Sequence, residues 1–347
     1  MSPVSVACIR EPHEIAEAAL FSASDDSSFV AGAQTFVSRG GAEIYVVDKS
    51  IQGTPEKGSK MTTHSHQTAP TQFVEANGVR FAFRRFGNAD GVPLVFNMHF
   101  NGTMDHWDPM VTDGFAKDRE VILFNNAGVS STSGEVPTTV QEMSANAIAF
   151  INALGLKKVD VFGFSIGGLI AQEIALQAPE LVRRLVLVGT GPRGGEGMAN
   201  ITPEMQEIYS AKYENPDHIW LRGFFTSSVA SQIAGLEFLR RFRLRSKERD
   251  PDVSEKVAPS QIEALAKWGA PQESFDYLKE IKQATLVVNG GNDVIIYPVN
   301  SFILQQNLPN AQLILYPDAG HGSHYQYPEL FVRHVSLFLS AADAWTV

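Results

Sequence analysis

From residue 71 onward, short apolar runs alternate with longer segments in which apolar residues recur every three or four positions. The runs at 93–98 and 121–124 are apolar almost throughout, as is typical of strands buried on both faces of a parallel sheet. The runs at 71–76 and 79–86 instead alternate around Asn77-Gly78, a hairpin turn signal. Four further strands are predicted at 159–162, 185–188, 285–288 and 312–316. This alternation predicts an α/β protein with a mostly parallel sheet of eight strands flanked by helices.

Helices are predicted between these strands. At 139–154 the apolar residues fall on one helical face, and Gly155 supplies a C-terminal stop. Similar patterns occupy 166–178 and 327–340. The span from about 194 to 280 contains helical patterns but no good strand. We expect it to be a helical lid inserted after the sixth strand, over a candidate site.

Residues 1–60 stand outside this alternation and read as loop and linker, because they are rich in Gly, Ser and Asp. We predict a non-catalytic extension and linker at 1–70 and one catalytic domain at 71–347. Within the extension, 11–37 resembles the last helix and strand of short-chain dehydrogenases. Since only that tail is present, the resemblance implies no dehydrogenase site, and we interpret the extension as an appended fragment.

Composition narrows the function classes. A hydrophobic share of 44% and a charged share of 19% are ordinary for a water-soluble globular protein, and the net charge of −10 argues against nucleic-acid partners. The basic run at 240–249 is interpreted as a solvated helix face. Cys8 is the only cysteine, which excludes an intrachain disulfide and, without a secretory apolar run, favours the cytoplasm. No segment has the ~20 consecutive apolar residues of a membrane helix.

The strongest chemical signal is Gly163-Phe164-Ser165-Ile166-Gly167, a G-x-S-x-G between a predicted buried strand and a predicted helix. A serine at such a turn is presented to solvent, and the two glycines remove side chains that would clash there. The following helix N-terminus offers unpaired N–H groups to a forming oxyanion, with Ile166 N–H as one donor. This context predicts Ser165 as a nucleophile.

A serine hydroxyl needs a base to take its proton. His321 is the best candidate, because it lies on the loop that follows the last predicted strand, at the strand end where open α/β sheets build their sites. His324 is close enough in the chain to rival it. His334 lies within a predicted helix and is interpreted as structural.

The base in turn needs a carboxylate that fixes its tautomer. Asp293 fits, because it follows the predicted strand 285–288 in a turn-rich loop. Asp318 is the rival, but it lies only three residues before His321 and is expected to order the loop through backbone hydrogen bonds. The resulting order is Ser, Asp, His.

A second oxyanion donor is expected from the loop after the strand at 93–98. The backbone N–H of either Phe100 or Asn101 could supply it, and the sequence does not choose between them. His99 precedes both residues and is interpreted as shaping the loop. In the predicted lid, Trp220, Phe224 and Phe225 are candidates for an apolar substrate pocket.

Four stretches together carry a family resemblance: GFSIGG at 163–168, LVLVGTGPRGG at 185–195, VVNGGNDVIIYP at 287–298 and DAGHGSHYQYP at 318–328. From about residue 71 to its end, the chain resembles the α/β-hydrolase superfamily, in the branch of small esterases, lactonases and cofactor-free haloperoxidases. The resemblance implies a Ser165, Asp293, His321 triad with no metal or organic cofactor. Many relatives have His-Gly where this chain has His99-Phe100, and many have Asp where it has Asn125 or Asn126.

The sequence therefore predicts an enzyme that cleaves an ester or lactone of a small, largely apolar substrate through an acyl-enzyme on Ser165. Two alternatives stay open. In a perhydrolase or haloperoxidase, peroxide replaces water on the same triad. In a hydrolase-fold receptor, a small ligand binds and is turned over slowly or not at all. His64 and His66 offer only two ligands, fewer than a zinc site needs.

Overall fold

The computed structural model describes residues 8–9, 33–38, 41–46 and 64–341. The chain divides into two compact units, Met1–Gly58 and Ser59–Val347. The larger unit is built on an eight-stranded sheet with the order β11-β10-β9-β8-β6-β7-β5-β4. Its strands are β4 (Gln72–Ala76), β5 (Val79–Gly87), β6 (Leu94–Asn97), β7 (Glu120–Phe124), β8 (Val159–Phe164), β9 (Val182–Val188), β10 (Ala284–Gly290) and β11 (Ala311–Tyr316). The predicted eight strands are confirmed.

The sheet is mostly parallel. From β7 to β11 each neighbouring pair runs parallel, whereas β5 runs antiparallel to both β4 and β7. Asn77 and Gly78 turn the β4–β5 hairpin with φ angles of 49° and 75°, the left-handed region that the Asn-Gly pair favours. Since parallel strands end at one edge of a sheet, the loops after β6, β8, β10 and β11 meet there.

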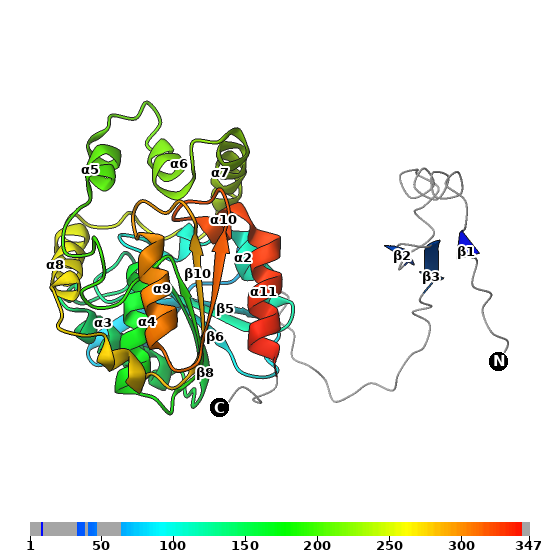
Figure 1. Ribbon diagram of the computed structural model, residues 1–347. Helices are drawn as coiled ribbons and strands as arrows, with labels where there is room; N and C mark the ends of the chain where they lie inside the picture. The colour runs from blue at the N-terminus through cyan, green and yellow to red at the C-terminus, as the bar shows by residue number, and fades with distance from the viewer. Residues whose placement is uncertain (1–7, 10–32, 39–40, 47–63, 342–347) are drawn as a thin grey trace. The chain divides into compact units, whose positions relative to one another are not determined.

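Helices cover both faces of the sheet, and Figure 1 shows α2 and α11 on one side and α3, α4 and α9 on the other. Each face has its own apolar cluster, and the rings of Phe96, Phe162 and Phe164 belong to the α2–α11 side. The helices outside the segment between β9 and β10 are α2 (Pro109–Ala116), α3 (Val140–Ala153), α4 (Ile166–Gln177), α9 (Pro298–Asn307), α10 (Ser323–Gln326) and α11 (Pro328–Ser340), with the 3-10 turn η2 (Met104–His106).

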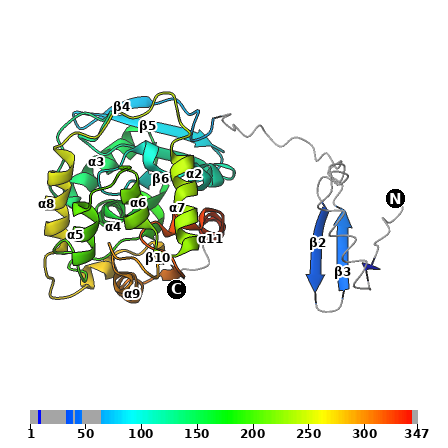
Figure 2. The same ribbon diagram turned by 90° about the horizontal axis from the view of Figure 1, so that it is seen from above.

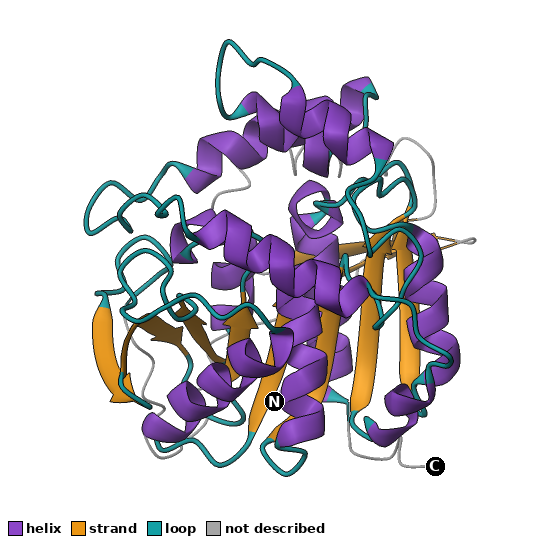
Figure 3. Ribbon diagram, turned by 90° about the vertical axis from the view of Figure 1, so that its left-hand side faces the viewer, coloured by secondary structure: helices purple, strands orange, loops and turns teal. Residues whose placement is uncertain are grey.

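The segment between β9 and β10, residues 189–283, is the predicted insertion and is named the insertion from here on. It contains α5 (Pro203–Ser210), α6 (His218–Phe224), α7 (Val229–Phe242), α8 (Val257–Gly269) and the 3-10 turn η3 (Asp276–Glu280). Seen from above, α6 and α7 lie over the middle of the domain (Figure 2), and Figure 1 shows α5, α6 and α7 above one end of the strands, where Figure 3 also shows a layer of helices.

The two halves of the insertion join different apolar clusters. Side chains of α6 and α7, such as Phe224 and Phe238, continue the cluster on the α2–α11 side of the sheet. Trp268 and Ala264 of α8 instead pack into the cluster with α3 and α4. The predicted lid at 194–280 is therefore a cover made of α5–α7, followed by a helix that belongs to the opposite face of the sheet.

The smaller unit contains strands in a region for which the sequence predicted loop and linker. β1 (Cys8–Ile9), β2 (Ala33–Ser38) and β3 (Gly41–Val46) form an antiparallel sheet with the order β1-β3-β2. The runs Thr-Phe-Val at 35–37 and Ile-Tyr-Val at 44–46 have high strand propensity. The loop prediction gave more weight to the Gly, Ser and Asp residues around them. β2 lies where the dehydrogenase-like strand was expected, and the expected helix lies outside the described residues.

Residues 64–70, assigned to the linker from sequence, pack against the rest of the larger unit. Arg245 donates hydrogen bonds of 2.9 and 3.0 Å to the carbonyl oxygens of His66 and Ala69. The backbone N–H of His66 also donates to Asp113 over 2.6 Å. Residues 64–70 thus belong to the larger compact unit, where Arg245, distant in the chain, binds a segment that has no local strand or helix pattern. Among the described residues, no helix has the length and apolar character to cross a membrane.

Candidate active site

The turn between β8 and α4 holds Ser165 in a strained backbone conformation, with φ 57° and ψ −123°. A Cβ added to Gly163 would lie 2.3 Å from the carbonyl oxygen of Gly167. One added to Gly167 would lie 2.1 Å from the carbonyl oxygen of Asn97, the last residue of β6. Both glycines are required because the backbone passes too close for any side chain, as the G-x-S-x-G pattern predicted.

Neighbouring strands hold this turn in place. The N–H of Ser165 donates to the carbonyl oxygen of Val188, at the end of β9, over 2.9 Å. The hydroxyl of Thr190 donates to the carbonyl oxygen of Ser165, also over 2.9 Å. Ser165 is 9% exposed, so its surroundings are already largely desolvated.

His321 and Asp293 form a buried pair. Nδ1 of His321 lies 2.8 Å from Oδ2 of Asp293. The other carboxylate oxygen, Oδ1, accepts hydrogen bonds from the N–H groups of Ile295 and Ile296 over 2.8 and 3.0 Å. Since a carboxylate oxygen is an acceptor, this contact assigns the donor to Nδ1 of His321 and leaves Nε2 as the acceptor of a neutral ring.

The imidazole of His321 lies beside the turn that holds Ser165, the predicted nucleophile. Its ring centre is 4.9 Å from that of Phe164, the residue before Ser165. Gly189, the residue after β9, has φ 52° and lies between these two rings. A Cβ on Gly189 would lie 3.1 Å from Cε1 and Nδ1 of His321. The fold therefore brings the predicted Ser165, Asp293 and His321 to the same edge of the sheet.

The two rival residues have other surroundings. His324 is enclosed by aromatic rings, with Phe164 4.3 Å and Tyr325 3.9 Å away, and neither of its nitrogens has a partner within residues 64–341. Burial lowers its pKa well below the ordinary value, so it is a neutral core residue. Asp318 accepts hydrogen bonds from the hydroxyls of Thr226 and Ser228 over 2.7 and 2.5 Å. The prediction that its carboxylate orders its own loop through the backbone was wrong, since it binds the insertion.

The loop after β6 distinguishes the two oxyanion candidates. The N–H of Asn101 donates to Oε1 of Gln261 on α8 over 2.7 Å, so it is already engaged. Within residues 64–341, the N–H of Phe100 has no acceptor. Ile166 begins α4 directly after Ser165, where helix N–H groups have no intrahelical partner. Phe100 and Ile166 are therefore the better pair of backbone donors.

His99 shapes this loop, as predicted. Its Nδ1 lies 2.8 Å from the carbonyl oxygen of Phe100, which is an acceptor, so Nδ1 carries the proton. Burial, together with the neighbouring His106, lowers the pKa of His99 to about 3. A neutral imidazole thus holds the peptide next to the free N–H of Phe100.

The three aromatic residues predicted for the pocket separate into two groups. The ring of Phe224 lies 5.5 Å from the rings of both His321 and His99, and its carbonyl oxygen accepts from Gly322 N–H over 2.9 Å. Trp220 lies 5.2 Å from the ring of His99. Phe225 instead packs against Phe238 within the insertion, 5.9 Å between ring centres, because consecutive residues at a helix end point in different directions.

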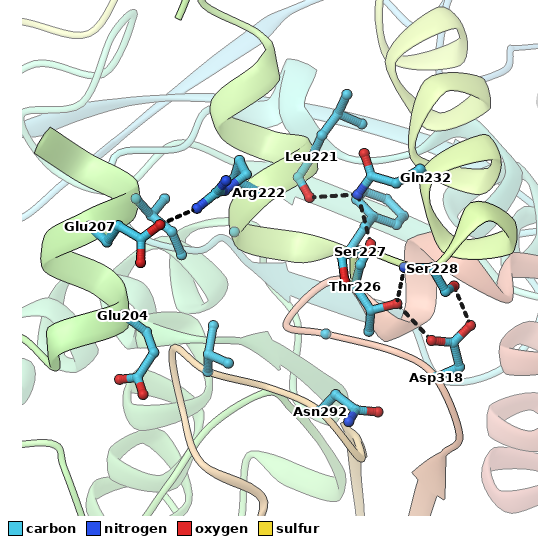
Figure 4. Close-up of a pocket in the computed structure, with 15 residues that line it drawn as sticks. Glu204, Glu207, Leu221, Arg222, Thr226, Ser227, Ser228, Gln232, Asn292 and Asp318 are labelled. Carbon is cyan, nitrogen blue, oxygen red and sulfur yellow. Dashed lines mark hydrogen bonds and ion pairs between the residues drawn. The ribbon is translucent and has the colours of Figure 1, made fainter. Parts of the chain in front are cut away.

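A cleft of about 850 Å³ lies behind the loops that carry Asp293 and His321. Figure 4 shows Asp318 bound to Thr226 and Ser228 on one side, and the ion pair of Arg222 with Glu207 on the other.

Phe225 lines this cleft, whereas Ser165, Asp293 and His321 do not. The three predicted triad residues therefore lie outside this cleft, and His321 instead lies beside Phe224.

The basic run at 240–249 is not simply a solvated face. Arg241 binds Asp108, with Nε 3.0 Å from Oδ1 and Nη2 2.6 Å from Oδ2. Arg245 is only 3% exposed and binds the 64–70 segment. Arg240 and Arg243 remain exposed and pair with Glu237 and Asp217. The solvated-face interpretation was wrong for Arg241 and Arg245, because their carboxylate and carbonyl partners lie more than 100 residues away in the chain.

Asn125 stands where many relatives have aspartate, and its hydrogen-bond partner accounts for an amide at this position. Its Oδ1 accepts from Met104 N–H over 2.8 Å, and its Nδ2 donates to Oδ1 of Asp250 over 3.0 Å. Burial raises the pKa of Asp250. An aspartate at 125 would place a second carboxylate against Asp250, so the amide suits this pair. No sequence motif marked Asp250.

A protein-family profile described as alpha/beta hydrolase fold matches residues 92–328. The chain belongs to this family. A solved alpha/beta hydrolase fold protein from Chitinophaga pinensis is 40% identical, with a TM-score of 0.76, and the match covers 80% of this chain and 100% of that one. Est816, described as an N-acyl homoserine lactone degrading enzyme, is 26% identical with a TM-score of 0.59, over 77% of this chain and 100% of its own.

Among curated proteins, one from Mycobacterium tuberculosis that bears the name of a non-heme bromoperoxidase is 27% identical over 264 residues, which is 74% of this chain and 97% of that protein. The names of these relatives support an enzyme of the hydrolase class. One name describes lactone degradation and another a bromoperoxidase, which correspond to the water-dependent and peroxide-dependent reactions considered from the sequence. Within the described residues, no group of three or more His, Cys, Asp or Glu side chains is placed to hold a metal ion.

Proposed function

We propose that this protein is a serine hydrolase that cleaves a carboxylic ester or lactone of a small, largely apolar substrate through an acyl-enzyme on Ser165. The observation that carries the proposal is the 2.8 Å contact between His321 Nδ1 and Asp293 Oδ2, beside a nucleophile turn with Ser165 at φ 57°. A histidine oriented by a carboxylate next to a strained serine is the arrangement that nucleophilic acyl transfer requires.

In the acylation step, Nε2 of His321 takes the proton of Ser165 while the serine oxygen bonds to the substrate carbonyl carbon. The carbonyl oxygen becomes an oxyanion, which the N–H groups of Phe100 and Ile166 stabilise. The bond to the leaving alkoxide then breaks, and the alkoxide takes the proton from His321. For a lactone, the alkoxide stays attached to the acyl chain.

In the deacylation step, His321 removes a proton from water, the hydroxide attacks the acyl carbon, and the serine oxygen leaves with the proton of His321. Asp293 stays ionised and stabilises the imidazolium in both steps. Phe224 and Trp220 enclose the space around His99 and His321, which favours apolar groups on the substrate. We keep the cytoplasm as the proposed compartment, because the chain has a single cysteine.

The test combines a panel of p-nitrophenyl esters and lactones with the Ser165→Ala variant. We expect kcat/KM to fall by at least about 10⁴-fold. A fluorophosphonate probe should add its mass to the wild type but not to the variant. Ser274→Ala, at an exposed serine, is the control and should behave as the wild type. Full activity of Ser165→Ala would exclude the mechanism.

The name of the Mycobacterium tuberculosis relative favours one second candidate, a perhydrolase in which hydrogen peroxide replaces water at the acyl-enzyme. Peroxide would attack the acyl carbon and release a peracid, which then oxidises bromide. Bromination of a reporter dye that requires peroxide, a carboxylic acid and Ser165 would favour this reaction. Ester hydrolysis without such bromination would leave water as the acceptor. A ligand receptor without turnover would instead bind esters and release no product.

A further inference from the structure

The side chain of His99 has a hydrogen-bonding atom that the proposed mechanism does not use. His99 follows β6, and its ring is enclosed by aromatic rings from two parts of the fold. Phe164, of the nucleophile turn, lies 5.3 Å away, and Trp220 and Phe224, of α6, lie 5.2 and 5.5 Å away between ring centres. His99 therefore lies where the insertion meets the nucleophile turn.

The protonation state of His99 follows from its neighbours. Nδ1 donates to the carbonyl oxygen of Phe100 over 2.8 Å, which assigns the proton of a neutral ring to that nitrogen. Burial lowers the pKa to about 3, so the ring stays neutral in ordinary buffers. Nε2 is then a bare acceptor that cannot donate.

Nε2 of His99 is buried and has no hydrogen-bond partner within residues 64–341. The nearby His106 differs, because its Nδ1 accepts from Thr103 N–H over 2.8 Å. A buried acceptor without a partner destabilises a protein unless something completes it. Within residues 64–341 no group directs a donor at His99 Nε2, so this acceptor is available to a molecule bound between α6 and the nucleophile turn.

We infer that Nε2 of His99 accepts a hydrogen bond from a hydroxyl or N–H group of the substrate, close to the carbonyl that Ser165 attacks. This inference rests on the proposed function. Phe100, the adjacent residue, supplies an oxyanion donor, and Phe224 contacts both His99 and His321. The substrate class is thus an ester or lactone that is apolar except for one donor beside its carbonyl.

The first test needs no variant. We compare kcat/KM for p-nitrophenyl butanoate with its 2-hydroxy, 2-methoxy, 3-hydroxy and 3-methoxy derivatives, each divided by its rate with hydroxide. The methoxy group keeps the oxygen and removes the donor. We expect one hydroxy ester to exceed its methoxy partner by about tenfold or more, because a site with an unpartnered acceptor rejects an analogue without the donor. Equal rates for both pairs would overturn the inference.

The second test uses His99→Phe, which keeps an aromatic ring and removes the acceptor. The preference for the hydroxy ester should fall to about onefold, even if loss of the Phe100 contact slows all substrates together. His324→Phe is the matched control, since it replaces another buried histidine that contacts Phe164, and it should keep the preference. A preference that survives His99→Phe, or one that His324→Phe also removes, would overturn the inference.

Two checks keep the outcomes distinct. Fluorophosphonate labelling at Ser165 identifies His99→Phe preparations with an intact nucleophile turn, and if none is obtained, the wild-type substrate series decides by itself. Hydrolysis that depends on Ser165 but shows no donor preference overturns the role of His99 and leaves the proposed function in place. Hydrolysis that survives Ser165→Ala overturns both.

Discussion

The loops after β8, β10 and β11 and the α6–α7 cover meet at the same site, but different interactions hold them. In the loops, backbone contacts within a few ångströms fix the residues: Gly167 lies against Asn97, and Gly290 lies against Ala319. The cover has a backbone hydrogen bond to the loops, from Gly322 N–H to the carbonyl oxygen of Phe224, and is otherwise held by side-chain hydrogen bonds to residues far away in the chain, such as Ser228 to Asp318. A change in the loops should therefore remove the fold or the chemistry, whereas a change in the cover should alter stability and substrate access by degrees.

Gly167→Ala should have the largest effect. A Cβ at this position would lie 2.1 Å from a backbone oxygen of β6, which cannot move without disturbing the sheet. We expect little or no folded protein, measured as soluble yield and circular dichroism. Gly155→Ala is the control, because Gly155 has φ 75° but nothing within 4 Å, and it should cost only about 1 kcal/mol in urea unfolding. A stable Gly167→Ala protein would contradict the steric argument.

Arg245→Ala should have the second-largest effect. It removes the donors to the carbonyl oxygens of His66 and Ala69, two residues that are themselves buried. We expect the free energy of unfolding to fall by about 3–5 kcal/mol, the usual cost of breaking a buried charged contact. Arg240→Ala, on the same segment but exposed and paired only with Glu237, should change it by less than about 0.5 kcal/mol. Similar losses in both variants would show that burial of Arg245 does not matter.

Asp318→Asn should have a smaller effect on the cover. The amide keeps an acceptor but loses the charge that binds Thr226 and Ser228, so α7 should be held less firmly. We expect KM to rise about threefold with kcat nearly unchanged. Asp276→Asn, at an exposed aspartate that binds Lys279, is the control and should leave KM unchanged. A loss confined to kcat would instead place Asp318 in the chemistry.

The same contact predicts a pH dependence. Hydrogen bonds from Ser228 and Thr226 lower the pKa of Asp318 below its ordinary value. Since the folded-state pKa is the lower one, the contact stabilises the cover at all pH values above about 4 and weakens as pH falls through the lowered pKa. The KM difference between wild type and Asp318→Asn should therefore shrink only in strongly acidic buffer. A difference that disappears near neutral pH would exclude this carboxylate as its cause.

Deletion of residues 1–60 should have the smallest effect. The proposed catalytic side chains and both groups of contacts belong to Ser59–Val347, so kcat/KM and the urea midpoint should match the full chain. Deletion of residues 1–70 should differ sharply, because it removes His66 and Ala69, the partners of Arg245. Loss of activity on deleting only residues 1–60 would show that the extension contributes to the enzyme.

The sequence alone determined the sheet, the nucleophile turn and the candidate triad residues. The reason is physical: buried parallel strands must be apolar, and a strand-to-helix turn with no room for Cβ atoms must have glycine at Gly163 and Gly167. Asp293 and His321 could be chosen because each follows a strand whose end has to lie at the same edge of the sheet. These constraints are local, so a single chain displays them as patterns.

Only the tertiary structure decided the remainder. It assigned Asp318 to the insertion, Arg245 to the 64–70 segment and the N–H of Asn101 to Gln261. It also separated Phe224 from its neighbour Phe225, which share a sequence pattern but point to different sides of α6. Each of these outcomes depends on which distant side chain supplies a partner, and a hydrogen bond between residues 90 or more positions apart leaves no periodicity or spacing in the sequence.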